Sequence, residues 1–324
     1  MKTTITLKLI SMVFLLACII SWQIGQKTVS ASDFYDDQYE VLKKIHLDTR
    51  SGYRKGNLNW NISAPNNSPN ILSELNYEDL EIYEAGVNAK AVINKFYSRA
   101  SINFGRIVDG IGLDSDYKEN DRNALYSQSE SNVSDGINDL CFGLGYQMDF
   151  FSKKLLIAPL AGLSYHSQKV RQKGGIQTIA ADGDRPAQGR LLSGLNSTYE
   201  AKWRTMFVGV DLDFEIMNNL FLLSSVEYHK ASYEAMADWN LRSDFAHPVS
   251  FIHEAIGQGT AVNISINRIF AKRWLIGLMV GWQDWSTDPG SDTLFWAGGG
   301  VSKSRLNEVN WESQSVNLSI GYNF

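Results

Sequence analysis

The sequence predicts an all-β fold: a transmembrane antiparallel β-barrel of ten strands with long extracellular loops and short periplasmic turns. Three observations support this prediction. Apolar residues alternate with small or polar ones, aromatic residues stand at the ends of the apolar stretches, and short connections alternate with long ones. The barrel is expected to occupy residues 32–324 as one domain.

The alternation is clearest at the C-terminus, where apolar or aromatic residues fill the even positions from Val316 to Phe324 and small or polar ones lie between them. Successive side chains on a strand point to opposite faces, so one face is apolar and the other polar. A water-soluble sandwich, with the apolar face as its core, is the alternative. The same period occurs at 140–150, 155–166, 206–215 and 262–267.

The positions of the aromatic residues favour a membrane barrel over a water-soluble sandwich. Trp274 and Trp282 lie on one apolar face, eight residues apart, and a tilted strand crosses the apolar layer in about 9 to 11 residues. Trp and Tyr at both borders are typical of outer-membrane barrels. The predicted periplasmic ring consists of Phe96, Phe150, Phe151, Phe221, Phe270, Tyr322 and Phe324.

Connection lengths set the strand number, because four short turns and five long loops require ten strands, and single-chain bacterial barrels have an even number. The short turns are Asn94/Lys95, Phe151 to Lys154, Met217 to Asn219 and Phe270 to Arg273. The long loops are Ser63 to Leu72, Asp114 to Gly136, Lys173 to Asn196, Asn240 to Ser250 and Asp288 to Asn307.

The N-terminal residues 1–31 are predicted to be a signal peptide. Lys2 and Lys8 precede an apolar run that is too short to span a bilayer, and the small-residue pattern ending at Ala31 supplies a cleavage site. A lipoprotein cleavage before Cys18 is the alternative. After cleavage at Ala31 only Cys141 remains, so no intramolecular disulfide can form.

Composition and absent motifs exclude several functions. The chain has 30 basic and 35 acidic residues, a mixed balance that argues against a nucleic-acid partner. The sequence lacks a P-loop, GxSxG, HExxH and a paired-cysteine metal site, so we expect neither cofactor nor metal. Asp182 and Asp184 are too few carboxylates for a predicted calcium site.

The polar face is expected to point into the lumen. Because an unpaired buried charge is costly, the mixed charges there should pair with one another. His166 and His229 are then interpreted as members of a structural network, with a catalytic or metal role as the alternative. A wide pore is disfavoured. The predicted inward residues are His46, Asp48, Arg50, Arg54, Glu84, Lys90, Arg99, His166, Asp211, Asp213, Glu227 and His229.

Five cations are predicted on the outer face just above the external membrane border: Lys169, Arg171, Lys173, Lys202 and Arg204. Ammonium and guanidinium groups bind phosphate well, so these residues form a candidate lipopolysaccharide-binding site. The alternative is ordinary solvated charge on strand extensions.

Local sequence resembles the omptins, ten-stranded outer-membrane aspartyl-type endoproteases. The run Ser73 to Tyr77 and the motif Asp114-Ser115-Asp116-Tyr117 carry the likeness, and Lys202 falls where omptins place a lipopolysaccharide-contacting basic residue. The resemblance implies that Asp114 and Asp116 face an Asp-x-His pair across a catalytic water. Here the corresponding stretch is Asp238-Trp239-Asn240, which lacks the histidine as general base.

Two further features bear on catalysis. His247 or His253 could be returned to Asp238 by a loop. Strand parity would point Asp114, Asp116, Asp238 and Asn240 outward unless a β-bulge resets each strand.

A closer match is the Protochlamydia outer membrane protein family, which the runs Trp239 to Arg242 and Val309 to Ser313 resemble. The resemblance implies a barrel in the bacterial outer membrane. We expect a monomeric, non-catalytic surface protein with a structural, adhesive or host-contact role, whose partners are lipopolysaccharide and a host or surface protein bound by the loops. The alternatives are an endoprotease using Asp114, Asp116 and Asp238, and a narrow channel.

Overall fold

The computed structural model describes residues 45–180 and 186–324, which form strands, turns and loops. The predicted signal peptide lies outside the described residues. Within the described ranges, no helix is long and apolar enough to cross a membrane. The strands are β1 (Ile45–Ile62), β2 (Ser73–Ile93), β3 (Phe96–Tyr117), β4 (Leu125–Tyr146), β5 (Met148–Phe150), β6 (Leu155–Ala180), β7 (Leu191–Leu192), β8 (Thr198–Met217), β9 (Leu220–Asp238), β10 (Phe251–Phe270), β11 (Trp274–Thr287), β12 (Gly290–Phe295) and β13 (Val301–Asn323).

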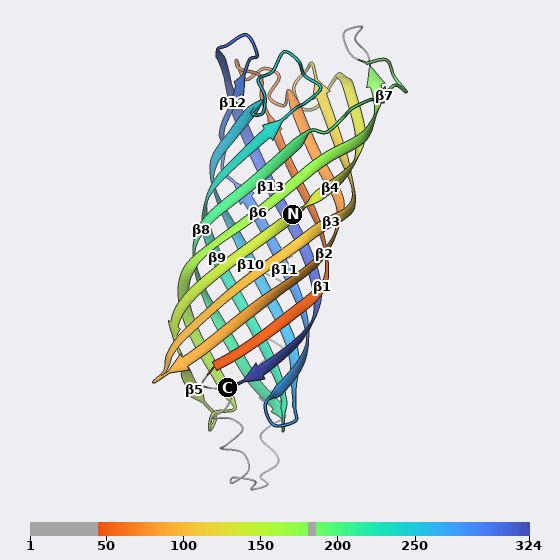
Figure 1. The fold of residues 1–324 in the computed structure, drawn as a ribbon. Helices are drawn as coiled ribbons and strands as arrows, with labels where there is room; N and C mark the ends of the chain where they lie inside the picture. Colours follow the sequence, from red (N-terminus) through yellow and green to blue (C-terminus); the bar gives the residue numbers. More distant parts are fainter. Residues whose placement is uncertain (1–44, 181–185) are drawn as a thin grey trace. The chain divides into compact units, whose positions relative to one another are not determined.

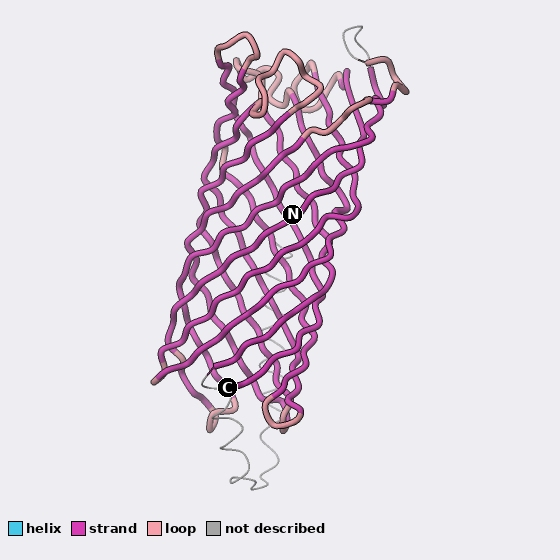
Figure 2. Tube along the Cα trace, in the orientation of Figure 1, coloured by secondary structure: helices cyan, strands magenta, loops and turns pink. Residues whose placement is uncertain are grey.

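Ten long antiparallel strands form a closed ring in the order β1-β2-β3-β4-β6-β8-β9-β10-β11-β13, and β13 pairs with β1 to complete it (Figure 1). The short β5 continues β4 past Gln147, while β7 and β12 add short pairings at the external end. Tilted strands run the length of the ring, with loops at its two ends (Figure 2). The predicted fold class and strand number are confirmed.

The four short turns are where the sequence placed them, whereas the strands are longer than expected. β3 continues to Tyr117 and β4 begins at Leu125, so most of the loop predicted from Asp114 to Gly136 is strand. The loop predicted from Asp288 to Asn307 likewise contains β12 and the start of β13. The ten long strands have 14 to 26 residues, more than the 9 to 11 or so that cross a bilayer, so the barrel wall continues outside the membrane.

The outer face carries the apolar stripes. Leu318, Val208 and Leu163 are 64%, 60% and 60% exposed, although their chain neighbours point inward. At the periplasmic end Trp274, Tyr322 and Phe324 stack edge to face. The assignment of Phe221 to this ring was wrong: Phe221 faces inward and packs with Ile269 and Leu275, because it has the same parity as Glu227 and His229 on β9.

An ion-paired network fills the lumen in its middle. Arg54 of β1 contacts Glu84 of β2 at 2.8 Å and Asp139 of β4 at 3.0 Å. Arg99 of β3 contacts Glu227 at 2.6 Å and Asp211 at 2.8 Å. The predicted pairing of interior charges is therefore present, and it links strands on different sides of the ring.

Both interior histidines belong to this network. His166 lies 2.9 Å from Asp139, and His229 lies 3.1 Å from Glu227. Ser164 and Thr205 connect the two rings by hydrogen bonds of 2.6 to 3.0 Å. The arrangement matches the predicted structural role.

The external half of the lumen is apolar, which the alternation did not predict. Aromatic and aliphatic side chains from opposite walls meet there, and Trp203, Trp285 and Trp311 are each at most 1% exposed. Trp60 of β1 stacks on Tyr199 of β8 with ring centroids 5.8 Å apart. Outside the membrane the barrel is thus stabilised by its own hydrophobic core.

Candidate functional site

A β-bulge turns Asp114 and Asp116 toward the interior. Four steps along β3, from Ile107 to Ile111, face three steps along β4, from Asp135 to Asn132. One extra residue reverses the alternation of side chains beyond it. Gly110 adopts a φ of +147° within this bulge, a backbone conformation that favours glycine.

The register with β2 fixes the direction of the Asp114 side chain. Asp114 pairs with Leu75, and Gly112 pairs with Tyr77. Directly paired residues of antiparallel strands share a face, and both Leu75 and Tyr77 belong to the buried interior cluster. The outward parity expected for Asp114 and Asp116 was therefore wrong, because the bulge resets the strand.

The aromatic residue of the D-x-D motif points to the opposite face. The Tyr117 hydroxyl donates a 2.8 Å hydrogen bond to Glu74, which also accepts from Arg122. Burial, followed by the hydrogen bond to Glu74, raises the pKa of Tyr117 to about 12. The phenol stays neutral and anchors the end of β3 to β2.

Asp238 points outward, as its parity predicts. Ala237 beside it is 2% exposed and lies in the interior cluster, and the register of Asp238 with Thr198 is regular. The following loop returns His247 to Asp238, with 2.6 Å between Nδ1 and Oδ1. The Nε2 of His247 lies 3.2 Å from the Arg242 carbonyl oxygen, so both ring nitrogens are engaged in holding the loop.

Asn240, at the position of the omptin histidine, joins two loops. Its amide oxygen accepts a 2.8 Å hydrogen bond from the Asn196 backbone N–H, and its amide nitrogen donates to the Gly194 carbonyl at 2.8 Å. The amide thus uses both its donor and its acceptor capacity for backbone groups. This arrangement gives Asn240 a structural role.

The two halves of the predicted carboxylate site lie on different faces of the wall. Asp114 faces the lumen and Asp238 faces outward. His253 points inward, is fully buried and lies 3.0 Å from the Tyr199 hydroxyl and 3.4 Å from Asp292. The arrangement does not bring Asp114 and Asp238 to opposite sides of one water.

The five predicted lipid-facing cations do share the outer face. Three of them contact a carboxylate, while Lys169 and Lys173 form no ion pair with any described residue. The pairs are Arg171 with Asp135 at 3.3 Å, Lys202 with Glu200 at 3.3 Å and Arg204 with Glu234 at 3.5 Å.

Arg106 is a sixth outward cation that the sequence reasoning missed, although it continues the outward parity of Phe104 on β3. Arg106 is exposed, and in the described part of the chain it has no ion-pair partner. Over the same residues, no three His, Cys, Asp or Glu side chains gather as metal ligands would.

Comparison with known sequences places the chain in a family. The profile of the family described as Protochlamydia outer membrane protein matches residues 48–324, which is nearly the whole barrel. The chain belongs to this family. Its members are outer-membrane proteins by that description, and the lipid-facing apolar belt agrees, so the protein is located in the bacterial outer membrane. No curated protein matches the sequence.

Solved structures show where else this fold occurs. The outer membrane protease OmpT from Escherichia coli is similar with a TM-score of 0.68 and 9% identity, covering 92% of this chain and 99% of OmpT. The translocator domain of the autotransporter NalP from Neisseria meningitidis has a TM-score of 0.37 and 8% identity, covering 98% and 97%. At such identities the likeness to OmpT shows that this family member has an omptin-like fold.

Proposed function

We propose that this outer-membrane barrel is a non-catalytic surface protein with a structural, adhesive or host-contact role. The observation that carries the proposal is the placement of Asp114 and Asp238 on opposite faces of the wall. A general base must lie within hydrogen-bond reach of the water it deprotonates. Asn240 and His247, the groups nearest Asp238 in sequence that could assist, are both engaged with backbone groups.

The filled interior supports the same proposal. Trp60, Tyr199 and Phe251 pack against one another across the external half of the lumen, with ring centroids 5.7 to 6.5 Å apart. A peptide substrate would need that space. An ion-paired layer lies beneath these aromatic side chains. Moving an ion through that layer would separate buried charge pairs, so the passage of solutes through the barrel is unfavourable as well.

The external loops supply the contact surface in this proposal. Leu241, Trp296 and Val301 are 43%, 37% and 56% exposed. Leu241 lies in the loop after β9, Trp296 and Val301 lie at the tip of the β12–β13 hairpin, and the Phe245–Trp296 bridge joins the two segments. Exposed apolar side chains on connected loops are suited to protein contact. Loops on a rigid barrel commonly carry binding function.

Lipopolysaccharide is the proposed lipid partner. Its phosphates lie at the level of the outward cations Lys169, Arg171, Lys173, Lys202 and Arg204, and charge-assisted hydrogen bonds to phosphate are strong. Arg171 and Arg204 also bridge neighbouring strands at the membrane border, whereas Lys202 contacts Glu200 of its own strand.

Peptide cleavage tests the absence of catalysis. Refolded protein in lipopolysaccharide would be incubated with a fluorogenic basic peptide, beside an Asp114→Ala variant and a buffer blank. We expect all three to give the same rate. Cleavage by the wild-type protein that disappears in Asp114→Ala would show an endoprotease and overturn the proposal.

A further inference from the structure

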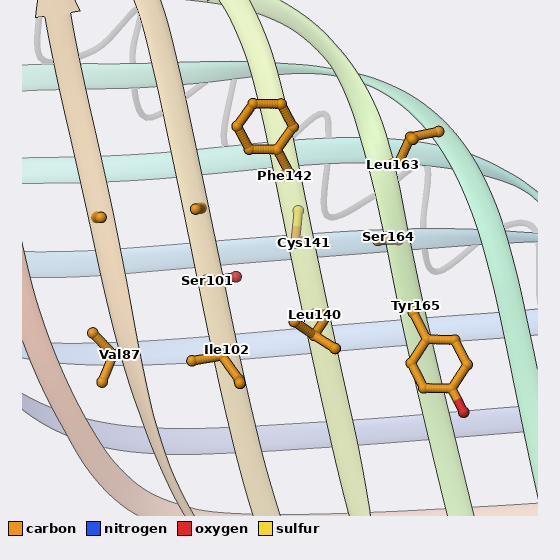
Figure 3. A pocket seen from close by; sticks show the side chains of 11 residues that line it. Val87, Ser101, Ile102, Leu140, Cys141, Phe142, Leu163, Ser164 and Tyr165 are labelled. Atoms are coloured by element: carbon orange, nitrogen blue, oxygen red, sulfur yellow. The ribbon is translucent and has the colours of Figure 1, made fainter.

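The lipid-facing side of β2, β3, β4 and β6 contains an apolar groove. Leu140 and Phe142 of β4 and Leu163 and Tyr165 of β6 border it on one side (Figure 3). Ala89 of β2 and Ala100 of β3, which pair with each other, form its floor, and Val87 and Ile102 border its external end two residues away on the same strands. The surface is hollowed over Ala89 and Ala100 because their methyl groups are smaller than the surrounding side chains.

Two cations flank a glycine on the external side of this groove. In the register, Arg106 of β3 pairs with Gly136 of β4, and Gly136 pairs with Lys169 of β6. Neighbouring strands are about 4.8 Å apart, so the two cationic residues are separated by about 10 Å of backbone. Because Gly136 has no side chain, the space between the two long side chains stays open to an anion.

These two cations differ from Arg171, Lys202 and Arg204 in forming no ion pair with a described residue, since Glu200, which pairs with Lys169 in the register, contacts Lys202 instead. Arg171, Lys202 and Arg204 each contact an acidic side chain. An anion at those three would have to compete with a carboxylate that is already in place. Among the described residues, no carboxylate is in contact with Arg106 or Lys169 that an anion would have to displace.

The vertical spacing fits a lipid. Arg106 is four residues beyond Ile102, and Lys169 is four residues beyond Tyr165, which is about 13 Å along each strand. With strands tilted by about 40°, this corresponds to about 10 Å along the membrane normal. Each polar headgroup layer is about 5 to 8 Å thick, so a phosphate at the cations places acyl methylenes at the groove.

We propose that this face binds one lipopolysaccharide molecule of the external leaflet, with a phosphate held between Arg106 and Lys169 and one acyl chain in the groove over Ala89 and Ala100. This proposal rests on the lipopolysaccharide contact proposed above and limits it to one phosphate site and one acyl-chain site. Of the five cations predicted from the sequence, only Lys169 belongs to this phosphate site, and Arg106 is added to it. The exposed Asn138 lies between the two levels, where a polar linkage of the lipid would pass.

Paired charge removals test the phosphate site. The full-length protein, extracted from outer membranes into detergent, is titrated with lipopolysaccharide and the Kd measured by native mass spectrometry. We expect R106Q/K169Q to weaken binding at least about tenfold, because each substitution removes a charge-assisted hydrogen bond to the phosphate and such bonds contribute more than neutral ones. For comparison, K202Q/R204Q removes the same charge from two other cations of the proposed lipopolysaccharide contact and is expected to weaken binding less, by about threefold, because each of them already contacts a carboxylate.

Filling the groove tests the acyl-chain site. Ala100→Phe should weaken binding of lipopolysaccharide at least about threefold but leave binding of its deacylated saccharide unchanged. Val316→Phe, a lipid-facing enlargement on β13, is the control and should change neither. Heat-modifiable gel mobility shows that each variant is folded.

Four outcomes would overturn the inference. Equal weakening by both charge pairs would leave the lipopolysaccharide contact standing and reject this site, and no weakening by either pair would reject both. If Ala100→Phe weakened binding of the deacylated saccharide as much as binding of lipopolysaccharide, the groove would be rejected as the acyl-chain site. Phosphatidylglycerol binding as tightly, with the same dependence on Arg106 and Lys169, would make a phosphodiester lipid the occupant instead.

Discussion

Replacing Arg54 with methionine should destabilise the barrel strongly. Arg54 is 4% exposed and joins two buried carboxylates, with its Nε 2.8 Å from Glu84 and its Nη2 3.0 Å from Asp139. Methionine fills similar volume but removes the positive charge and its donors. Glu84 and Asp139 would then remain buried without their counter-ion.

The expected loss is about 3 kcal/mol of unfolding free energy, the lower end of the range for breaking one side of a buried ion pair. The lower end applies because both carboxylates keep other donors. Glu84 still accepts from Asn103 at 2.9 Å and from Asn317 at 2.7 Å, and Asp139 still lies 2.9 Å from His166. Neutralising both acids in R54M/E84Q/D139N should recover most of the loss.

Urea unfolding of the protein in lipid vesicles, followed by tryptophan fluorescence, measures this change. Lys55→Met is the control: the neighbouring Lys55 contacts Asp79 at 2.8 Å on the outer surface with more than half of its side chain exposed, so stability should stay the same. If R54M unfolds at the same urea concentration as K55M, the interior network does not stabilise the barrel and the reasoning fails.

Further predictions concern the bulge and the loops. In a Cys141→Ser background, a membrane-impermeant maleimide should label Asp238→Cys at least about tenfold faster than Asp114→Cys, and equal rates would contradict their placement on opposite faces. Gly110→Ala should cost about 1 to 3 kcal/mol in urea unfolding, since φ is +147° and an added Cβ lies 2.8 Å from Leu80; an unchanged midpoint would argue against the bulge. Asn240→Ala should speed proteolysis within the loops it joins without shifting the unfolding midpoint, and an intact digestion pattern would contradict the role of Asn240 as a latch.

The period of two predicted the membrane part well because lipid and lumen impose a strict contrast on alternate residues. Leu318 and Ile320 face lipid, while Asn317 between them donates to Glu84 inside. The same contrast predicted that Arg54 and Arg99 would have acidic partners. Turns such as Asn94/Lys95 were found because two residues with positive φ close a tight hairpin.

The external half of the barrel was less predictable. There the outer face meets water and the lumen is apolar, so alternate residues no longer show a strict contrast between apolar and polar side chains. Leu75 and Tyr77 face inward, yet they lie beyond an extra residue in β2 at Asp79, which shifts their parity from that of Glu84. Nothing in the local sequence of β3 announces the matching extra residue near Gly110. The direction of Asp114, and with it the assembly of the predicted carboxylate site, depended on that single residue.

The claim on which the account depends is that the lumen is filled, by the charge network around Arg54 and Arg99 and by the aromatic core around Trp60. Single-channel recording in a planar bilayer tests it most directly. We expect no unitary conductance from the wild-type protein after insertion is confirmed by gel mobility. A steady, reproducible conductance would show an open path through the barrel and contradict it.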